Sequence, residues 1–114
     1  MKLGEVCLHT DDVCRLANFY KELLHIENDS TDEVHQFIFS EETMLTILND
    51  GTEKNSGNNI SLAFTVDDVD LEYQRLLDMG ATIVDKPTTQ PWGTRNLHFL
   101  DPDGNNIYFR AFLK

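Results

Sequence analysis

Late in its sequence the chain reads Arg95-Asn96-Leu97-His98-Phe99-Leu100-Asp101-Pro102-Asp103-Gly104-Asn105-Asn106-Ile107-Tyr108-Phe109. The two outer parts of this stretch are rich in aromatic and β-branched residues, which favour strands. Between them, Pro102 presets its own φ for a turn and Gly104 tolerates a positive φ. The carboxylates of Asp101 and Asp103 can accept hydrogen bonds from nearby backbone amides. The stretch therefore predicts a strand, a tight turn and a second strand.

The chain also contains an internal repeat. Val66-Asp67-Asp68-Val69 nearly repeats Thr10-Asp11-Asp12-Val13, at an offset of 68 − 12 = 56 residues. Each tetrapeptide follows a strand-like run and precedes a helical pattern, and a hairpin at about 34–49 echoes the one at about 95–112. Two copies nearly fill the 114 residues, whereas a solenoid needs about three repeats or more. The repeat therefore predicts one duplicated module.

Each copy is predicted to have the element order βαβββ. The elements expected in the first copy are a strand at 4–10, a helix at about 13–25, a short strand within the polar segment 26–32, and the hairpin at about 34–49. Those expected in the second copy are a strand at 60–66, a helix that stops at Gly80, a short strand at 81–84, a loop at 86–93, and the hairpin at about 95–112. A polar linker separates the copies. We therefore predict a single α+β domain, residues 1–114, built from tandem modules at 1–54 and 58–114.

The composition of the chain argues against several classes of function. The formal charge of −11 would repel phosphates and argues against nucleic-acid binding. No apolar run reaches about 18 residues, so no membrane partner is expected. The start of the chain leads into a strand rather than into a signal peptide. Cys7 and Cys14 are expected to stay unbridged. Together these features predict a cytoplasmic protein.

The sequence resembles the vicinal oxygen chelate superfamily, which includes glyoxalase I, extradiol dioxygenases, fosfomycin-resistance enzymes and bleomycin-resistance proteins. The residues that carry the resemblance are Asp12 with Phe19-Tyr20, Val66-Asp67, and Pro91-Trp92-Gly93 with Arg95 before Asp101-Pro102-Asp103-Gly104-Asn105. The resemblance covers the whole chain. It implies mixed sheets that curl into an open cup facing a ligand, helices packed behind the sheets, and a two-fold symmetric homodimer.

Enzymes of that superfamily hold a divalent metal in the cup, usually through His, Glu or Gln. The resemblance implies that the four ligand positions here are Glu5, Thr46, Ser61 and Tyr108. Of these, only Glu5 is an ordinary metal ligand, and one carboxylate cannot hold a catalytic metal alone. His9 lies four residues after Glu5, about 13 Å along a strand, which is too far for one ion to bridge. We therefore expect no metal and no other cofactor.

The cup is then expected to bind a small organic molecule, because aromatic faces with a few convergent polar groups are typical of such sites. The predicted ligand-binding residues are His9, Phe37, Thr46, Ser61, Trp92, Arg95, Asn96, His98, Tyr108 and Arg110. In this prediction His98 and Tyr108 line one wall and Trp92 closes over the mouth. Arg95 would orient a carboxylate or carbonyl oxygen of the ligand.

Three functions remain open from the sequence. The first is a metal-free protein of the bleomycin-resistance type, which sequesters a planar or aromatic compound between dimer-related cups. The alternative is a glyoxalase-type lyase, isomerase or thiol transferase, with or without a divalent metal, in which Glu5 and His98 serve as general base and acid. The third is an accessory domain without a ligand.

Overall fold

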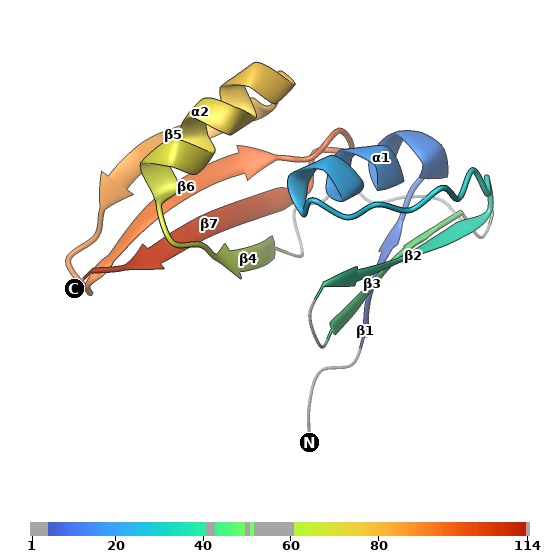
Figure 1. Ribbon diagram of the computed structural model, residues 1–114, viewed down its shortest axis with the longest axis horizontal. Helices are drawn as coiled ribbons and strands as arrows, with labels where there is room; N and C mark the ends of the chain where they lie inside the picture. Colours follow the sequence, from blue (N-terminus) through green and yellow to red (C-terminus); the bar gives the residue numbers. More distant parts are fainter. Residues whose placement is uncertain (1–4, 41–42, 50, 52–60, 114) are drawn as a thin grey trace. The chain divides into compact units, whose positions relative to one another are not determined.

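The structure, a computed structural model, describes residues 5–40, 43–49, 51 and 61–113 (Figure 1). It divides into two compact units, residues 1–55 and 56–114. Each unit has its own open, mixed sheet covered on one face by one helix. This is the predicted α+β fold of two tandem modules, each with one helix and an open mixed sheet.

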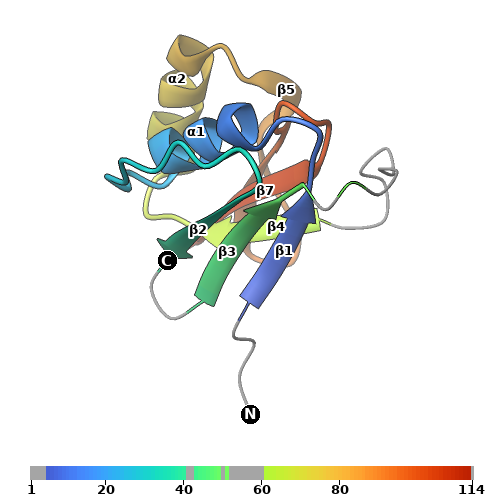
Figure 2. The same ribbon diagram turned by 90° about the vertical axis from the view of Figure 1, so that its right-hand side faces the viewer.

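The first unit contains β1 (Glu5–His9), α1 (Val13–Leu23), β2 (His35–Ser40) and β3 (Thr43–Leu48). The strand order is β1-β3-β2, with β1 parallel and β2 antiparallel to β3. Asp12 caps α1 by accepting a hydrogen bond from the Arg15 amide at 3.1 Å. The helix α1 lies over one face of the sheet (Figure 2). The core between them consists of Leu8, Leu16, Tyr20, Leu23, Ile38, Leu45 and Ile47.

The short strand expected within residues 26–32 is not formed. Side-chain oxygens in this polar segment accept hydrogen bonds from backbone amides two residues further on: Asn28 accepts from the Ser30 amide at 2.9 Å, and Asp32 accepts from the Val34 amide at 2.8 Å. Such local turns compete with strand pairing for the same backbone groups. The first module therefore has three strands among its described residues.

The second unit contains β4 (Ser61–Thr65), α2 (Val69–Met79), β5 (Thr82–Thr89), β6 (Thr94–Leu100) and β7 (Asn106–Phe112). Its strand order is β4-β7-β6-β5, with β4 parallel to β7 and the other pairs antiparallel. Asp68 caps α2, and Gly80 ends it in the left-handed conformation with φ of 77°. The βαβββ pattern is complete in this module.

The predicted turn between the two closing strands is confirmed. One carboxylate oxygen of Asp101 accepts from the amides of Asp103 and Asn105, each at 2.9 Å, and Gly104 has φ of 84°. Because the turn fixes the β6–β7 register, His98 pairs directly with Tyr108.

The strand β5 is longer than predicted. It was expected to end at 84 and to be followed by a loop at 86–93, but it continues through Pro87 to Thr89. It is the edge strand and pairs with β6 alone, so the missing N–H of Pro87 breaks no second ladder. The register shifts between Ile83 and Asp85 and again between Asp85 and Thr88, which marks two bulges.

Strand register supports the predicted duplication. Glu5 pairs with Met44, two residues before Thr46, and Ser61 pairs with Asn106, two residues before Tyr108. Glu5 and Ser61 therefore occupy equivalent places in their modules. Neither helix in the described part of the chain combines the length and hydrophobicity that a bilayer crossing requires.

Candidate functional site

The sheet of the second unit has two different faces. Facing α2 are Leu97, Phe99, Ile107 and Phe109, all at most 2% exposed. Strand alternation turns Asn96, His98, Tyr108 and Arg110 to the opposite face. That face is free of α2 and carries the polar and aromatic side chains of the unit's candidate site.

A cavity of about 390 Å³ lies on this face. It is lined by Asp85, Thr88, Gln90, Trp92, Asn96, His98 and Tyr108. All seven come from β5, β6, β7 and the β5–β6 turn, so a single module builds the cavity. Its volume falls within the range of roughly 300–1,000 Å³ that small-molecule sites occupy.

The wall of the cavity is a stacked ring pair. The rings of His98 and Tyr108 lie 4.3 Å apart between centroids and only 12° from parallel. Nε2 of His98 lies 2.8 Å from Oδ1 of Asn106, and its Nδ1 lies 3.6 Å from a carboxylate oxygen of Asp85. His98 is 15% exposed at its side chain. Its ring is thus held between two oxygen acceptors, and a neutral imidazole can donate to only one of them.

The bulges in β5 bring Asp85 into the cavity. Ile83 pairs with Phe99 on the α2 side, and simple alternation would place Asp85 on that side too. The register shift instead sets Asp85 opposite His98, and the next shift sets Thr88 opposite Asn96. The sequence prediction missed Asp85 and Thr88 because it ended the strand at 84, before both register shifts. It also missed Gln90, which lies in the turn after β5. The β-branched pair Thr88-Thr89 was the available signal for a strand.

Four predicted ligand-binding residues line the cavity: Trp92, Asn96, His98 and Tyr108. Trp92 belongs to the turn between β5 and β6, in which the Gly93 amide donates to the Gln90 carbonyl at 3.2 Å. Its side chain is 68% exposed. The placement agrees with an aromatic group at the mouth, while ligand binding by these residues stays a prediction.

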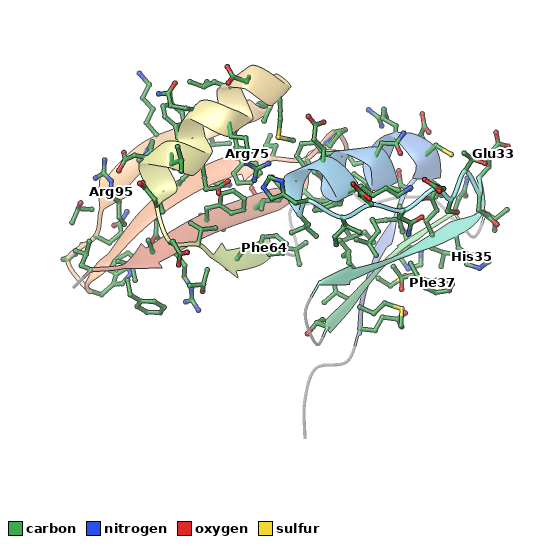
Figure 3. All side chains as sticks on the ribbon, viewed as in Figure 1. Glu33, His35, Phe37, Phe64, Arg75 and Arg95 are labelled. Carbon is green, nitrogen blue, oxygen red and sulfur yellow. The ribbon has the colours of Figure 1, made fainter. Side chains whose placement is uncertain are left out.

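Arg95 does not line the cavity, so ligand binding by Arg95 stays a prediction. Alternation along β6 turns it toward α2, where it makes a two-pronged ion pair with Asp70, both contacts at 2.9 Å (Figure 3). A third nitrogen of Arg95 donates to Thr89 at 3.0 Å. The hydrogen bond from Arg95 lowers the pKa of Asp70, and the same bond raises the pKa of Arg95. All three nitrogens of the guanidinium therefore make hydrogen bonds on the helix side of the sheet.

Two other predicted residues of this unit lie outside the cavity lining. Arg110 is on the cavity face, but it donates to Thr65 of β4 at 3.2 Å and lies 5.2 Å from the ring centre of Phe112. It therefore reaches toward β4 rather than toward β5. Ser61 is exposed at the start of β4.

The predicted residues of the first unit share the face opposite α1. Thr46 pairs with Cys7 and Phe37, and its hydroxyl donates to the Glu5 carboxylate. Phe37 packs edge-on against His35 on the outer side of β2 (Figure 3), and His9 is exposed at the end of β1. The predicted acid–base pairing of Glu5 with His98 joins two different units and stays a prediction.

The donor set at the four implied ligand positions does not fit a divalent metal. Thr46 uses its hydroxyl to donate to Glu5, Ser61 offers only a hydroxyl, and Tyr108 is a phenol stacked on an imidazole. Within residues 5–40, 43–49, 51 and 61–113, no three His, Cys, Asp or Glu side chains lie close enough together to hold an ion.

Comparisons with known proteins agree with the architecture. The model of the Glyoxalase/Bleomycin resistance protein/Dioxygenase superfamily matches residues 2–109. The uncharacterized protein YraH of Bacillus subtilis is 33% identical over an aligned length of 124, gaps included, and the alignment covers 94% of this chain and 95% of YraH.

Two solved structures show the same fold at low identity. One is a glyoxalase/bleomycin resistance protein/dioxygenase family enzyme from Burkholderia phytofirmans, with a TM-score of 0.83 and 18% identity over 99% of this chain and 100% of that one. The other is a lactoylglutathione lyase from Agrobacterium tumefaciens, with a TM-score of 0.76 and 19% identity over 96% of this chain and 92% of that one. The family model, the identity to YraH and the two-module fold together give one conclusion: the chain belongs to the glyoxalase/bleomycin resistance protein/dioxygenase superfamily.

Proposed function

We propose that this protein binds a small planar organic molecule, without a metal, in the cavity of its second module. The observation that carries the proposal is the cavity of about 390 Å³ with Trp92 at its rim and the stacked His98–Tyr108 pair as its wall. A flat ligand could stack on these rings, each contact contributing on the order of 1 kcal/mol beyond the burial of area. Asn96, Thr88 and Gln90 supply neutral polar groups that could orient it.

The fluorescence of Trp92 tests the proposal directly, because Trp92 is the only tryptophan in the sequence. Screening planar aromatic metabolites and antibiotics should yield compounds that quench it saturably. Tyr108→Ala should lower the affinity of the protein for these compounds by about fivefold or more, since it removes one stacked ring. Tyr73→Ala, in α2 on the far face of the same sheet, is the matched control and should leave the affinity unchanged.

If compounds are found whose affinity is unchanged by Tyr108→Ala, they bind outside the proposed cavity. If calorimetry and fluorescence both detect no binder of any class, the accessory-domain function gains support over this proposal.

A second candidate is a glyoxalase-type lyase, isomerase or thiol transferase. The observation that favours it is His98, whose ring lies between Asn106 and Asp85 at the cavity wall and is positioned to move a proton. Turnover of a bound compound by the parent protein, abolished by His98→Gln while affinity is retained, would identify an enzyme. Binding without turnover would favour sequestration.

We also propose that two copies associate into a two-fold dimer. Phe112 and Leu113, at the end of β7, are 61% and 50% exposed, and large apolar side chains of this kind are often covered by association. Light scattering should give about twice the 13.1 kDa of one chain. A single-chain mass at micromolar concentration would contradict the dimer.

A further inference from the structure

The cavity lining contains one carboxylate. Of the seven lining residues, only Asp85 has an acidic side chain, and that side chain is 75% exposed. Its carboxylate lies 3.6 Å from Nδ1 of His98, at the ring that forms the wall. A ligand stacked on that ring would therefore lie within a few ångströms of a negative charge.

The arginines of β6 and β7 do not reach into the cavity. Arg95 is on the opposite face of the sheet, where Asp70 takes both prongs of its guanidinium. Arg110 is on the cavity face but extends to Thr65 of β4, away from β5. Neither arginine lines the cavity.

The aromatic groups of the cavity, like Asp85, favour a cationic ligand. The faces of tryptophan and tyrosine rings are electron-rich and attract cations that stack on them. Trp92 and Tyr108 both line the cavity. The net charge of −11 adds a long-range field that attracts cations and repels anions.

From these observations we propose that the cavity of the second module selects planar organic cations, such as protonated or N-alkylated heteroaromatic compounds, over neutral and anionic molecules of the same shape. This inference rests on the proposed binding function and adds the charge class of the ligand. It replaces the carboxylate-bearing ligand that the sequence suggested through Arg95.

Three compounds of one size separate charge from shape: N-methylquinolinium as the cation, 2-quinolone as the neutral compound and quinoline-2-carboxylate as the anion. Each is titrated into the full-length protein at one buffered pH, with quenching of Trp92 and isothermal titration calorimetry as parallel readouts. The cation should bind about fivefold more tightly than the neutral compound, and the anion about fivefold more weakly than the neutral one, as expected for one charge a few ångströms away in a water-exposed site. Added sodium chloride should reduce the preference for the cation.

Two variants assign the preference to one residue. Asp85→Asn keeps the size and polarity of the side chain and should bring the three affinities to within about twofold of one another. Asp78→Asn changes the net charge equally, but it lies exposed on α2, on the far face of the sheet, and should keep the preference. Circular dichroism checks that both variants fold like the parent.

Equal binding of the three compounds to the parent, or an undiminished preference in Asp85→Asn, overturns this inference and leaves the proposed binding function standing. Absence of binding by all three in both readouts, together with a screen that finds no other planar binder, removes the proposed function and this inference with it.

Discussion

Replacing Asp101 by alanine removes the carboxylate that holds the β6–β7 turn. Asp101 is 4% exposed. One of its oxygens accepts from the amides of Asp103 and Asn105 at 2.9 Å, and the other accepts from the Asn105 side chain at 2.7 Å. The turn sets the register that places His98 against Tyr108, so its loss affects both stability and the cavity.

The expected cost follows from these hydrogen bonds. A hydrogen bond to a charged group contributes roughly 1.5–3 kcal/mol, but amides freed in a turn regain part of this by bonding to water. We therefore expect Asp101→Ala to lower the free energy of unfolding by about 3 kcal/mol. With about 2.1 cal/mol/K of unfolding entropy per residue, a chain of 114 residues should lose roughly 12 °C in Tm.

Urea and thermal unfolding, followed by far-ultraviolet circular dichroism, measure this loss. Asp101→Asn keeps an acceptor for the two backbone amides but loses the acceptor for the Asn105 side chain, so it should lose about half as much, or about 1.5 kcal/mol. Asp78→Ala, exposed on α2, is the control and should leave the Tm nearly unchanged. If Asp101→Ala stays within about 0.5 kcal/mol of the parent, strand pairing alone holds the hairpin and the argument from the turn is wrong.

Three further predictions concern other parts of the chain. Because Arg95 lowers the pKa of Asp70 below its ordinary value of 3.8, the stability from this pair is present above that value and is lost as the pH falls through the lowered pKa. The urea midpoint of the parent should therefore fall more steeply on acidification than that of Arg95→Gln. If the midpoints of the two proteins fall equally with pH, the Arg95–Asp70 ion pair does not contribute to stability. Gly80→Ala should lower the free energy of unfolding by about 1 kcal/mol through its φ of 77° alone, since an added Cβ would meet nothing within 4 Å; a stabilised variant would contradict this. Elemental analysis of the purified protein should find well under one equivalent of zinc, nickel, manganese or iron per chain, whereas a stoichiometric metal lost in Glu5→Gln would show that the donor set had been misjudged.

Local chemistry in the sequence determined the modular fold. The repeated Asp-Asp pairs predicted both helix starts, and Asp12 and Asp68 cap α1 and α2. The Asp101–Asn105 segment predicted the closing turn, and the alternating strands separated a helix-facing side from the side of His98 and Tyr108. These features could be read from the sequence because each depends on residues within a few positions of one another.

Tertiary structure alone decided which side chains meet in the cavity. Asp85 faces His98 because the first register shift of β5 against β6 lies between Ile83 and Asp85, and a shift of one residue reverses the face of the side chains that follow. Arg95 lies toward α2 because it belongs to β6 rather than to the preceding loop, and therefore shares the face of the core residues Leu97 and Phe99. Both outcomes follow from strand pairing, which places Asp85 in the cavity lining and leaves Arg95 outside it.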